Sequence, residues 1–135
     1  MDLSEIRAKY PGLKTFVFGD SKELCDELTT LVIRGKKIAT CEALGAYASG
    51  GEEMPVLGRV DVALTWEQEP AVAIRTIGIE IMMFSEVKEG FALDEGENTD
   101  LEGWRKDHQE YFERSGHFDL KMEVVCERFE VVEIY

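Results

Sequence analysis

The sequence is short of basic residues and has no long apolar run. Its 135 residues include 15 Lys and Arg against 28 Asp and Glu, which gives a formal net charge of −13. Non-specific binding of duplex nucleic acid depends on many Lys and Arg contacts to phosphate, so we expect no duplex DNA partner. No stretch approaches the roughly 20 apolar residues of a membrane span, and the segment MDLSEIRAKY is no signal peptide. These absences predict a protein that does not enter a membrane, and the reduced cysteines described next favour the cytoplasm.

Cysteine and histidine are also scarce. Cys25, Cys41 and Cys126 are odd in number and form no CxxC pair, and their apolar neighbours favour buried, reduced thiols. His108 and His117 lack the spacing of a zinc site. The sequence also contains no Gly-rich phosphate loop, GxSxG elbow or HExxH helix. We therefore expect neither a metal nor a cofactor.

What is present is the composition of one globular domain. Hydrophobic residues make up 44% and aromatic residues 10% of the chain, and no repeat or linker divides it, which predicts a single domain over 1–135. Periodicity and capping residues predict a helix over 2–9, a second between Asp20 and Gly35, and a third between Thr99 and Gly116. Asp20 and Thr99 are the expected N-caps of the second and third helices.

The remaining segments predict strands. Alternation or β-rich composition favours strands over 15–18, 60–66, 71–83 and 121–135, with Gly78 as a candidate bulge or bend. Residues 41–48 fit either a short helix capped by Thr40 or a continued strand, and 85–93 fits short helical turns. Because hairpin-like loops join most of these strands, we expect an α+β fold with a mixed or antiparallel sheet curled towards a small β-barrel, flanked by helices.

The first candidate site is the segment from Gly35 to Thr40. Lys36 and Lys37 follow a helix end, and a hydroxyl follows three residues after Lys37. A lysine whose pKa is lowered by burial can activate a neighbouring hydroxyl as a nucleophile. In a regular strand Lys37 and Thr40 would point to opposite faces, so a turn at Thr40 is needed to bring them together. The alternative is a solvated junction with a routine capping threonine.

Two further candidates lie later in the chain. The acidic loop at 94–100 includes Glu95 and Glu97, whose carboxylates could bind a divalent cation, act as general acid and base, or simply be solvated at a helix N-terminus. On the following helix, Arg105 and His108 could hold an anion or a base edge, and Trp104 could stack on a nucleobase. Alternatively, Trp104 belongs to the core and His108 is a structural hydrogen-bonding residue.

Taken together, these segments resemble the ASCH domain family over nearly the whole chain. No single segment is diagnostic, but their order and spacing make chance similarity unlikely. The segments that carry the resemblance are Phe18-Gly19-Asp20-Ser21, Gly35-Lys36-Lys37-Ile38-Ala39-Thr40, Gly51-Glu52, Glu95-Gly96-Glu97, Trp104-Arg105, Tyr111-Phe112 and Val125-Cys126-Glu127-Arg128-Phe129.

The resemblance implies a PUA-like fold, which is a small β-barrel with flanking helices and a cleft. It also implies binding of RNA. Some members are ribonucleases, and a small bacterial relative removes the acetyl group from N4-acetylcytidine with a lysine, a threonine three residues later and a glutamate. The corresponding residues here are Lys37, Thr40 and Glu95, with Glu97 as the alternative carboxylate.

The sequence therefore leaves two main functions open. One is a hydrolase on a modified nucleoside or RNA, with Thr40 as the nucleophile, Lys37 as its activator and Glu95 as the proton carrier. Lys36, Glu97, Trp104, Arg105 and His108 would help to bind the substrate. The other is a non-catalytic module that binds RNA or a nucleoside through the same cleft. A third alternative is a protein-interaction or structural domain with a vestigial cleft, which could form a homodimer through an exposed apolar strand surface.

Overall fold

The computed structural model describes residues 1–48 and 50–135, and its centre is one mixed sheet. The sheet comprises β1 (Thr15–Phe16), β2 (Ala39–Ala43), β3 (Val60–Leu64), β4 (Pro70–Met83) and β5 (Glu123–Ile134). The strand order is β1-β3-β4-β5-β2, with β1 parallel to β3 and the other neighbours antiparallel. The predicted α+β class with a mixed sheet is confirmed.

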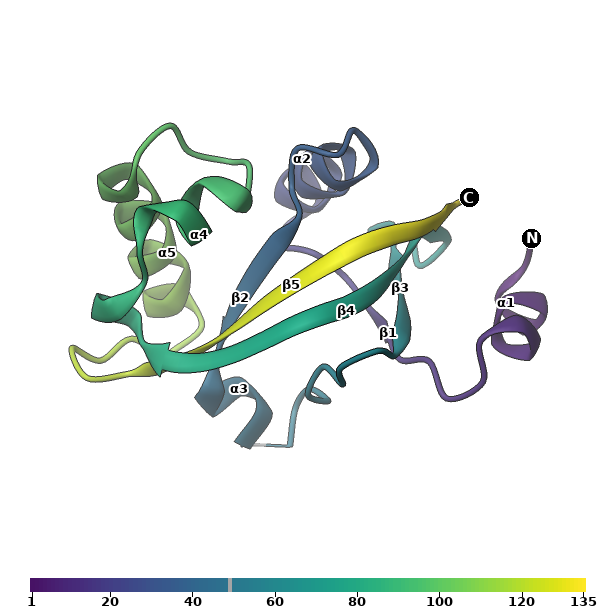
Figure 1. The fold of residues 1–135 in the computed structure, drawn as a ribbon, viewed down its shortest axis with the longest axis horizontal. Coiled ribbons are helices and arrows are strands. Elements are labelled where there is room, and N and C mark those ends of the chain that lie inside the picture. Colours follow the sequence, from purple (N-terminus) through teal and green to yellow (C-terminus); the bar gives the residue numbers. More distant parts are fainter. Residues whose placement is uncertain (49) are drawn as a thin grey trace.

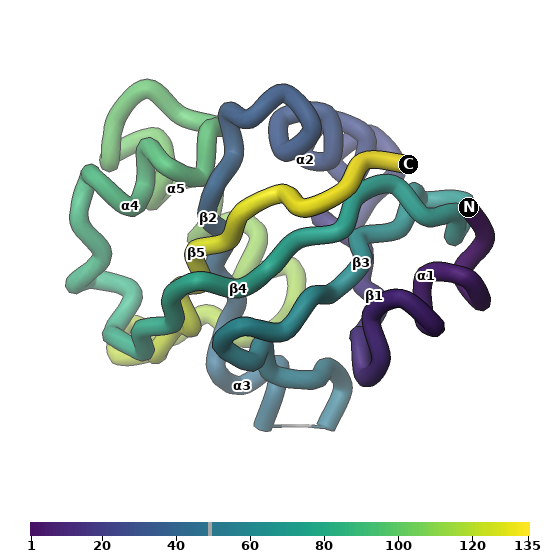
Figure 2. The backbone as a smooth tube through the Cα atoms, turned by 45° about the vertical axis from the view of Figure 1, so that its right-hand side comes forward, coloured from purple at the N-terminus to yellow at the C-terminus, as the bar shows by residue number. Residues whose placement is uncertain are grey.

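The helices lie around the sheet (Figure 1). They are α1 (Leu3–Lys9), α2 (Lys22–Ile33), α3 (Leu44–Ala48), α4 (Glu89–Asp94) and α5 (Leu101–Arg114), with a 3-10 turn over Phe84–Glu86. Helices α4 and α5 lie together at one end of the sheet, and α1 lies at the other end beside β1 and β3 (Figures 1 and 2). Trp104 and Phe112 of α5 pack with Ala39 and Val124 in the largest apolar cluster.

Both long helices begin one residue away from the predicted caps. The side chain of Ser21 accepts the Leu24 N–H at the start of α2, and the side chain of Asp100 accepts the Gly103 N–H at the start of α5. Asp20 and Thr99 are therefore not the caps. Helix α2 buries Leu28 and Val32 against Phe18 and Phe129, as its amphipathic pattern predicts.

Of the two alternatives for residues 41–48, the strand continues to Ala43 and a helix follows, so Thr40 is not the cap of that helix. Thr40 lies inside β2, which pairs with β5 along its whole length from Ala39↔Arg128 to Ala43↔Val124. The short helix α3 begins only after this ladder ends, at Leu44. Pairing with β5 satisfies the backbone of the Ala-rich segment, and the helical alternative would leave this sheet edge without its partner.

The sheet does not close into the expected β-barrel. The strands β1 and β2 stand at opposite ends of the strand order, and no pairing joins them within the described ranges 1–48 and 50–135. Strand β1 is only two residues long, so it offers too few backbone groups to continue the ladder. The predicted irregularity at Gly78 is confirmed, because the β4–β5 register shifts between Thr76 and Gly78.

Two further predictions concern the state of the cysteines and the absence of a membrane-spanning helix. Cys25, Cys41 and Cys126 are buried free thiols, as predicted. Within residues 1–48 and 50–135, no helix combines the length and apolar character that crossing a membrane would require.

Candidate functional site

A cavity of about 580 Å³ lies between the two edges of the sheet. Residues from Thr15 to Phe18 line it from the β1 side, and residues from Thr40 to Glu42 line it from β2. Leu28 of α2 and His108 of α5 also contribute to its wall. Small-molecule sites in proteins commonly have volumes of about 300–1,000 Å³. The gap left by the unclosed sheet is therefore large enough to hold a ligand.

Lys37 is buried at one end of this cavity, and the turn after α2 directs it there. The backbone N–H groups of Lys36 and Lys37 both donate to the Leu31 carbonyl, at 2.9 and 3.1 Å. The Lys37 side chain is 1% exposed. Its Nζ donates to Glu95 Oε1 at 3.0 Å, to Glu97 Oε2 at 3.3 Å and to the Glu95 backbone carbonyl at 3.4 Å. Three acceptors thus match the three hydrogens of the ammonium.

The charge state of Lys37 follows from these contacts. Burial by itself lowers the pKa of Lys37, but the two carboxylates outweigh burial and raise the pKa above its ordinary value. Lys37 is therefore an ammonium ion. This is opposite to the lowered pKa that a lysine needs in order to take a proton from a hydroxyl.

Glu95 follows α4 and is held by donors on both carboxylate oxygens. Oε1 accepts from Lys37, and Oε2 accepts from Trp104 Nε1 at 2.7 Å and faces His108 Nε2 at 3.2 Å. Burial tends to raise the pKa of Glu95, but Lys37 and His108 together lower it to about 2. Glu95 is a permanent anion whose position is fixed by three neighbours.

His108 is held between two acceptors. Its Nδ1 lies 2.9 Å from the Trp104 carbonyl, which can only accept, and its Nε2 faces the ionised Glu95. Both ring nitrogens must then carry hydrogen, which makes the ring an imidazolium. Burial lowers the pKa of His108, but Glu95 outweighs it and raises the pKa above 6.5. The ring also stacks on Trp104 with centroids 4.2 Å apart.

Glu97 differs from Glu95 in its surroundings. Among residues 1–48 and 50–135, its carboxylate accepts a hydrogen bond from Lys37 alone, and 17% of its side chain is exposed at the cavity. Burial raises the pKa of Glu97, and Lys37 lowers it too little to reverse the effect. Of the two carboxyls beside Lys37, Glu97 is thus the one that can gain and lose a proton.

Gly96 allows this loop to approach Lys37. Its φ is +81°, and a Cβ at this position would lie 2.5 Å from the Lys36 carbonyl oxygen. The Ile38 N–H also donates to the Asp94 carbonyl at 2.9 Å. The two backbone segments therefore pack directly against each other, which places the Glu95 and Glu97 side chains on either side of the ammonium.

Thr40 lies on the wall of the same cavity, half-buried on β2. Lys37 precedes the first residue of β2, so the strand rule that would separate the two side chains does not apply to it. In the part of the chain that the structure describes, the Thr40 hydroxyl has no side-chain hydrogen-bond partner. The hydroxyl is therefore free to meet a ligand.

Three predicted substrate-binding residues do not line the cavity. Trp104 is 0% exposed and stacks on Phe84 in the core at a centroid distance of 5.4 Å, so its face is not open to a nucleobase. Arg105 donates to the Ser85 and Val87 carbonyls, both at 3.1 Å. Lys36 is exposed outside the cavity.

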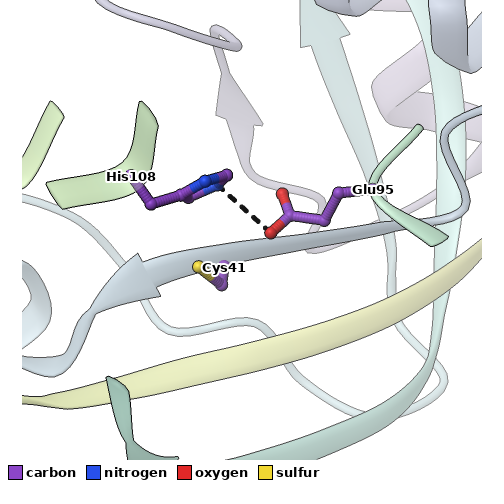
Figure 3. Close-up of side chains that lie close together, drawn as sticks. All are labelled: Cys41, Glu95 and His108. Carbon is purple, nitrogen blue, oxygen red and sulfur yellow. Dashed lines mark ion pairs between the residues drawn. The ribbon is translucent and has the colours of Figure 1, made fainter. Parts of the chain in front are cut away.

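Figure 3 shows Cys41, Glu95 and His108 close together, and these residue types are zinc ligands. Their ligand atoms lie within 4.8 Å of one another. However, Glu95 already accepts from Lys37 and Trp104, and His108 Nε2 carries a hydrogen where a metal would need a lone pair. The arrangement suits an ionic network better than a metal centre.

The sequence analysis missed part of the cavity wall. These residues come from several strands, from α5 and from the segment before β1, which only the tertiary fold brings together: Lys14, Phe16, Glu42, Asp61, Tyr111 and Glu127. The alternation of Val124, Cys126 and Phe129 predicted β5, but no local signal indicates which strand pairs with it.

Comparisons with known proteins agree with this architecture. A sequence model described as the ASCH domain matches residues 14–133. An ASCH domain from Lactobacillus crispatus JV V101 is similar in structure, with a TM-score of 0.82 and 29% identity over 94% of this chain and 84% of that one. A protein from Enterococcus faecalis V583 also has a TM-score of 0.82, with 33% identity over 98% of this chain and 90% of that one.

A more distant similarity concerns the fold alone. A mutant ASCH protein from Zymomonas mobilis has a TM-score of 0.53 and 8% identity over 91% of this chain and 73% of that chain. A search of curated proteins finds no significant match.

We predict that Gly96→Ala destabilises the protein more than Gly116→Ala. Both glycines have positive φ, +81° and +80°, so each alanine incurs about 1–2 kcal/mol of left-handed strain. Only the Cβ at 96 meets backbone atoms within 4 Å, which adds about 1–3 kcal/mol of overpacking. Urea denaturation of both variants measures the difference. Equal losses in the free energy of unfolding would contradict the close approach at Gly96.

We also predict that His108 titrates above pH 6.5 in the folded protein, as followed by NMR of its ring protons. Because the folded-state pKa exceeds the unfolded value, the stabilisation from His108 is complete below pH 6.5. It is lost as the pH rises through the folded-state pKa. A titration midpoint at or below 6.5 would show that Glu95 does not hold an imidazolium.

Proposed function

This chain belongs to the ASCH domain family, and from that membership we propose that it binds a modified nucleoside, free or within RNA, and hydrolyses an N4-acyl group from its base. One observation carries the proposal. A buried ammonium, a carboxyl that can exchange protons and an unpartnered hydroxyl border the same cavity, on Lys37, Glu97 and Thr40. Acyl transfer can use a hydroxyl as nucleophile, a carboxyl as proton carrier and a cation to stabilise developing negative charge.

In this proposal Thr40 is the nucleophile. Its hydroxyl oxygen attacks the acyl carbon of the substrate and forms an acyl-threonine intermediate, which water later hydrolyses. Lys37 does not activate the hydroxyl, because its pKa is raised and it holds its proton. Its role is to stabilise the negative charge that develops on the acyl oxygen, as a fixed cation in a buried site does effectively.

The two glutamates have separate roles. Glu95 is an anion with both oxygens engaged, so it positions Lys37 and keeps it charged. Glu97 has a raised pKa and faces the cavity, so it is the proton carrier for the leaving amine. The family resemblance favoured Glu95 for this role, with Glu97 as the alternative, whereas the surroundings of the two carboxyls support Glu97.

The charge of the cavity bears on the substrate. Nine Asp or Glu side chains line it, against three from Lys or Arg. Such a wall repels phosphate and favours a small neutral ligand. A free nucleoside, or a single base turned out of an RNA strand, fits this charge better than a continuous phosphate backbone.

We predict that purified protein releases acetate from N4-acetylcytidine and that Thr40→Val lowers kcat/KM by more than about 10³-fold. Glu97→Gln should lower it by about 10²–10⁴-fold, because the leaving amine loses its proton donor. Valine keeps the β-branched shape that suits a strand, so the effect reports the hydroxyl. Chromatography of cytidine against time measures each rate.

Thr40→Ser is the matched control, because it keeps a hydroxyl at the same position and should retain measurable turnover. Full activity of Thr40→Val would remove Thr40 from the mechanism. Binding of the nucleoside without turnover would make the protein a non-catalytic module. Cleavage of single-stranded RNA with no release of acetate would favour a ribonuclease, and RNA binding that weakens steeply with salt would indicate phosphate contacts.

A further inference from the structure

Glu127 is a buried carboxyl in the cavity wall that the steps above leave unused. It lies on β5, is 8% exposed and lines the same cavity as Thr40. Within residues 1–48 and 50–135, no Lys, Arg or His forms an ion pair with it, although the other buried carboxyls Asp61 and Glu95 both have one. An unpaired buried carboxyl is costly to ionise, so its retention in a cavity wall calls for an explanation.

The register of the sheet places Glu127 next to Thr40. The two residues are direct Cα partners in the antiparallel pairing of β2 and β5. Side chains of such partners lie on the same face, with Cβ atoms about 4.5–5.5 Å apart. Both side chains reach the cavity. The backbone ladder thus holds the Glu127 carboxyl directly across from Thr40.

One oxygen of Glu127 is fixed and the other is not. The Thr76 hydroxyl of β4 donates to Oε2 at 2.7 Å. The Oε1 atom has no hydrogen-bond partner in the part of the chain that the structure describes. The Thr76 contact therefore holds Oε2 and leaves Oε1 free to accept a hydrogen bond.

The charged groups around Glu127 come from several elements. Burial raises the pKa of Glu127, and the nearby Asp61 raises it further. The Thr76 hydrogen bond, Lys14 and Arg59 lower this pKa, but the net result is a raised pKa. The phenol of Tyr47 also lies within electrostatic reach. A carboxyl with a raised pKa is a stronger base than an ordinary glutamate.

We propose that Glu127 is the general base that takes the proton of the Thr40 hydroxyl during acyl transfer. The inference rests on the proposed function for the identity of the nucleophile. It supplies the base that Lys37, as an ammonium ion, cannot be.

Every proton that leaves one of the three residues is replaced within one catalytic cycle. In the first step the Thr40 proton moves to Glu127, the Thr40 oxygen bonds to the acyl carbon, and the amide C–N bond breaks as Glu97 gives its proton to the nitrogen. In the second step water attacks the acyl carbon and its proton moves to Glu97. The C–O bond to Thr40 then breaks, and Glu127 returns its proton to the threonine oxygen. The products are an amine and a carboxylic acid, and all three residues regain their initial states.

The test uses p-nitrophenyl acetate, an activated ester that can acetylate a nucleophile without nucleoside recognition. Acetylation of Thr40 is followed by mass spectrometry of peptides, with Thr40→Val as the blank. We expect Glu127→Gln to slow Thr40 acetylation by about 100-fold or more. Gln is nearly isosteric and can still accept from Thr76. Glu130→Gln, the same change on β5 at an exposed position outside the cavity, should leave the rate within about twofold.

A pH profile separates base catalysis from a structural role. In the unmodified protein the acetylation rate should rise with pH through the pKa of Glu127, and this rise should disappear in Glu127→Gln. Thr76→Val provides a second test that keeps the carboxyl. Because the Thr76 hydrogen bond lowers the pKa of Glu127, its loss should move the midpoint of the profile to higher pH.

The outcomes distinguish the two proposals. Equal Thr40 acetylation in Glu127→Gln and unmodified protein, or no acetylation of Thr40 at all, would overturn the role of Glu127. A midpoint unmoved by Thr76→Val would also count against it. Acetylation that depends on Glu127, in a protein that leaves N4-acetylcytidine intact, would instead reject the proposed substrate and support the base.

Discussion

The buried ion pair between Lys37 and Glu95 is the interaction on which the site depends. It joins the turn after α2 to the loop after α4, and Trp104 and His108 attach α5 to the same carboxylate. A buried ionic network of this kind stabilises a fold no better than well-packed apolar side chains of similar volume, whereas removing one partner typically costs about 3–5 kcal/mol. The network is therefore better explained by what it holds in place, which is a permanent cation at the end of a cavity.

Local sequence patterns predicted the elements but not their pairing. The periodicity of α2 and the alternation in β3, β4 and β5 depend on neighbouring residues, so these elements could be found from the sequence. Residues 41–48 fitted a short helix or a continued strand, and only pairing with β5, more than 80 residues away, keeps the chain in β2 as far as Ala43 before α3 begins. The predicted barrel did not close because closure depends on how far β1 extends. Strand β1 pairs with β3 over only two residues, and local sequence does not reveal this length.

The sequence indicated some of the residues that line the cavity, and it misplaced others. Lys37, Thr40 and the Glu95-Gly96-Glu97 loop were indicated by a family resemblance, because spacing alone set Lys37 and Thr40 on opposite faces of a strand. Trp104 was offered as a surface for a base, yet its indole N–H donates to Glu95 and its ring lies in the core. Burial of an aromatic residue on an amphipathic helix depends on which face meets the sheet.

The open edge between β1 and β2 explains why the cavity can hold so many ionisable groups. A small closed barrel fills its interior with packed side chains, and carboxyls there would need cations or would be neutral. Here the two edges of the sheet stay apart, so Glu127 and Glu97 lie at a wall that water or a ligand can reach. The charge of Glu95, which lies deeper in the ionic network, is neutralised by Lys37 and His108. Because the sheet does not close, the fixed anion Glu95 is separated from Glu97 and Glu127, which can exchange protons. Acyl transfer with an acid and a base requires carboxyls of this second kind.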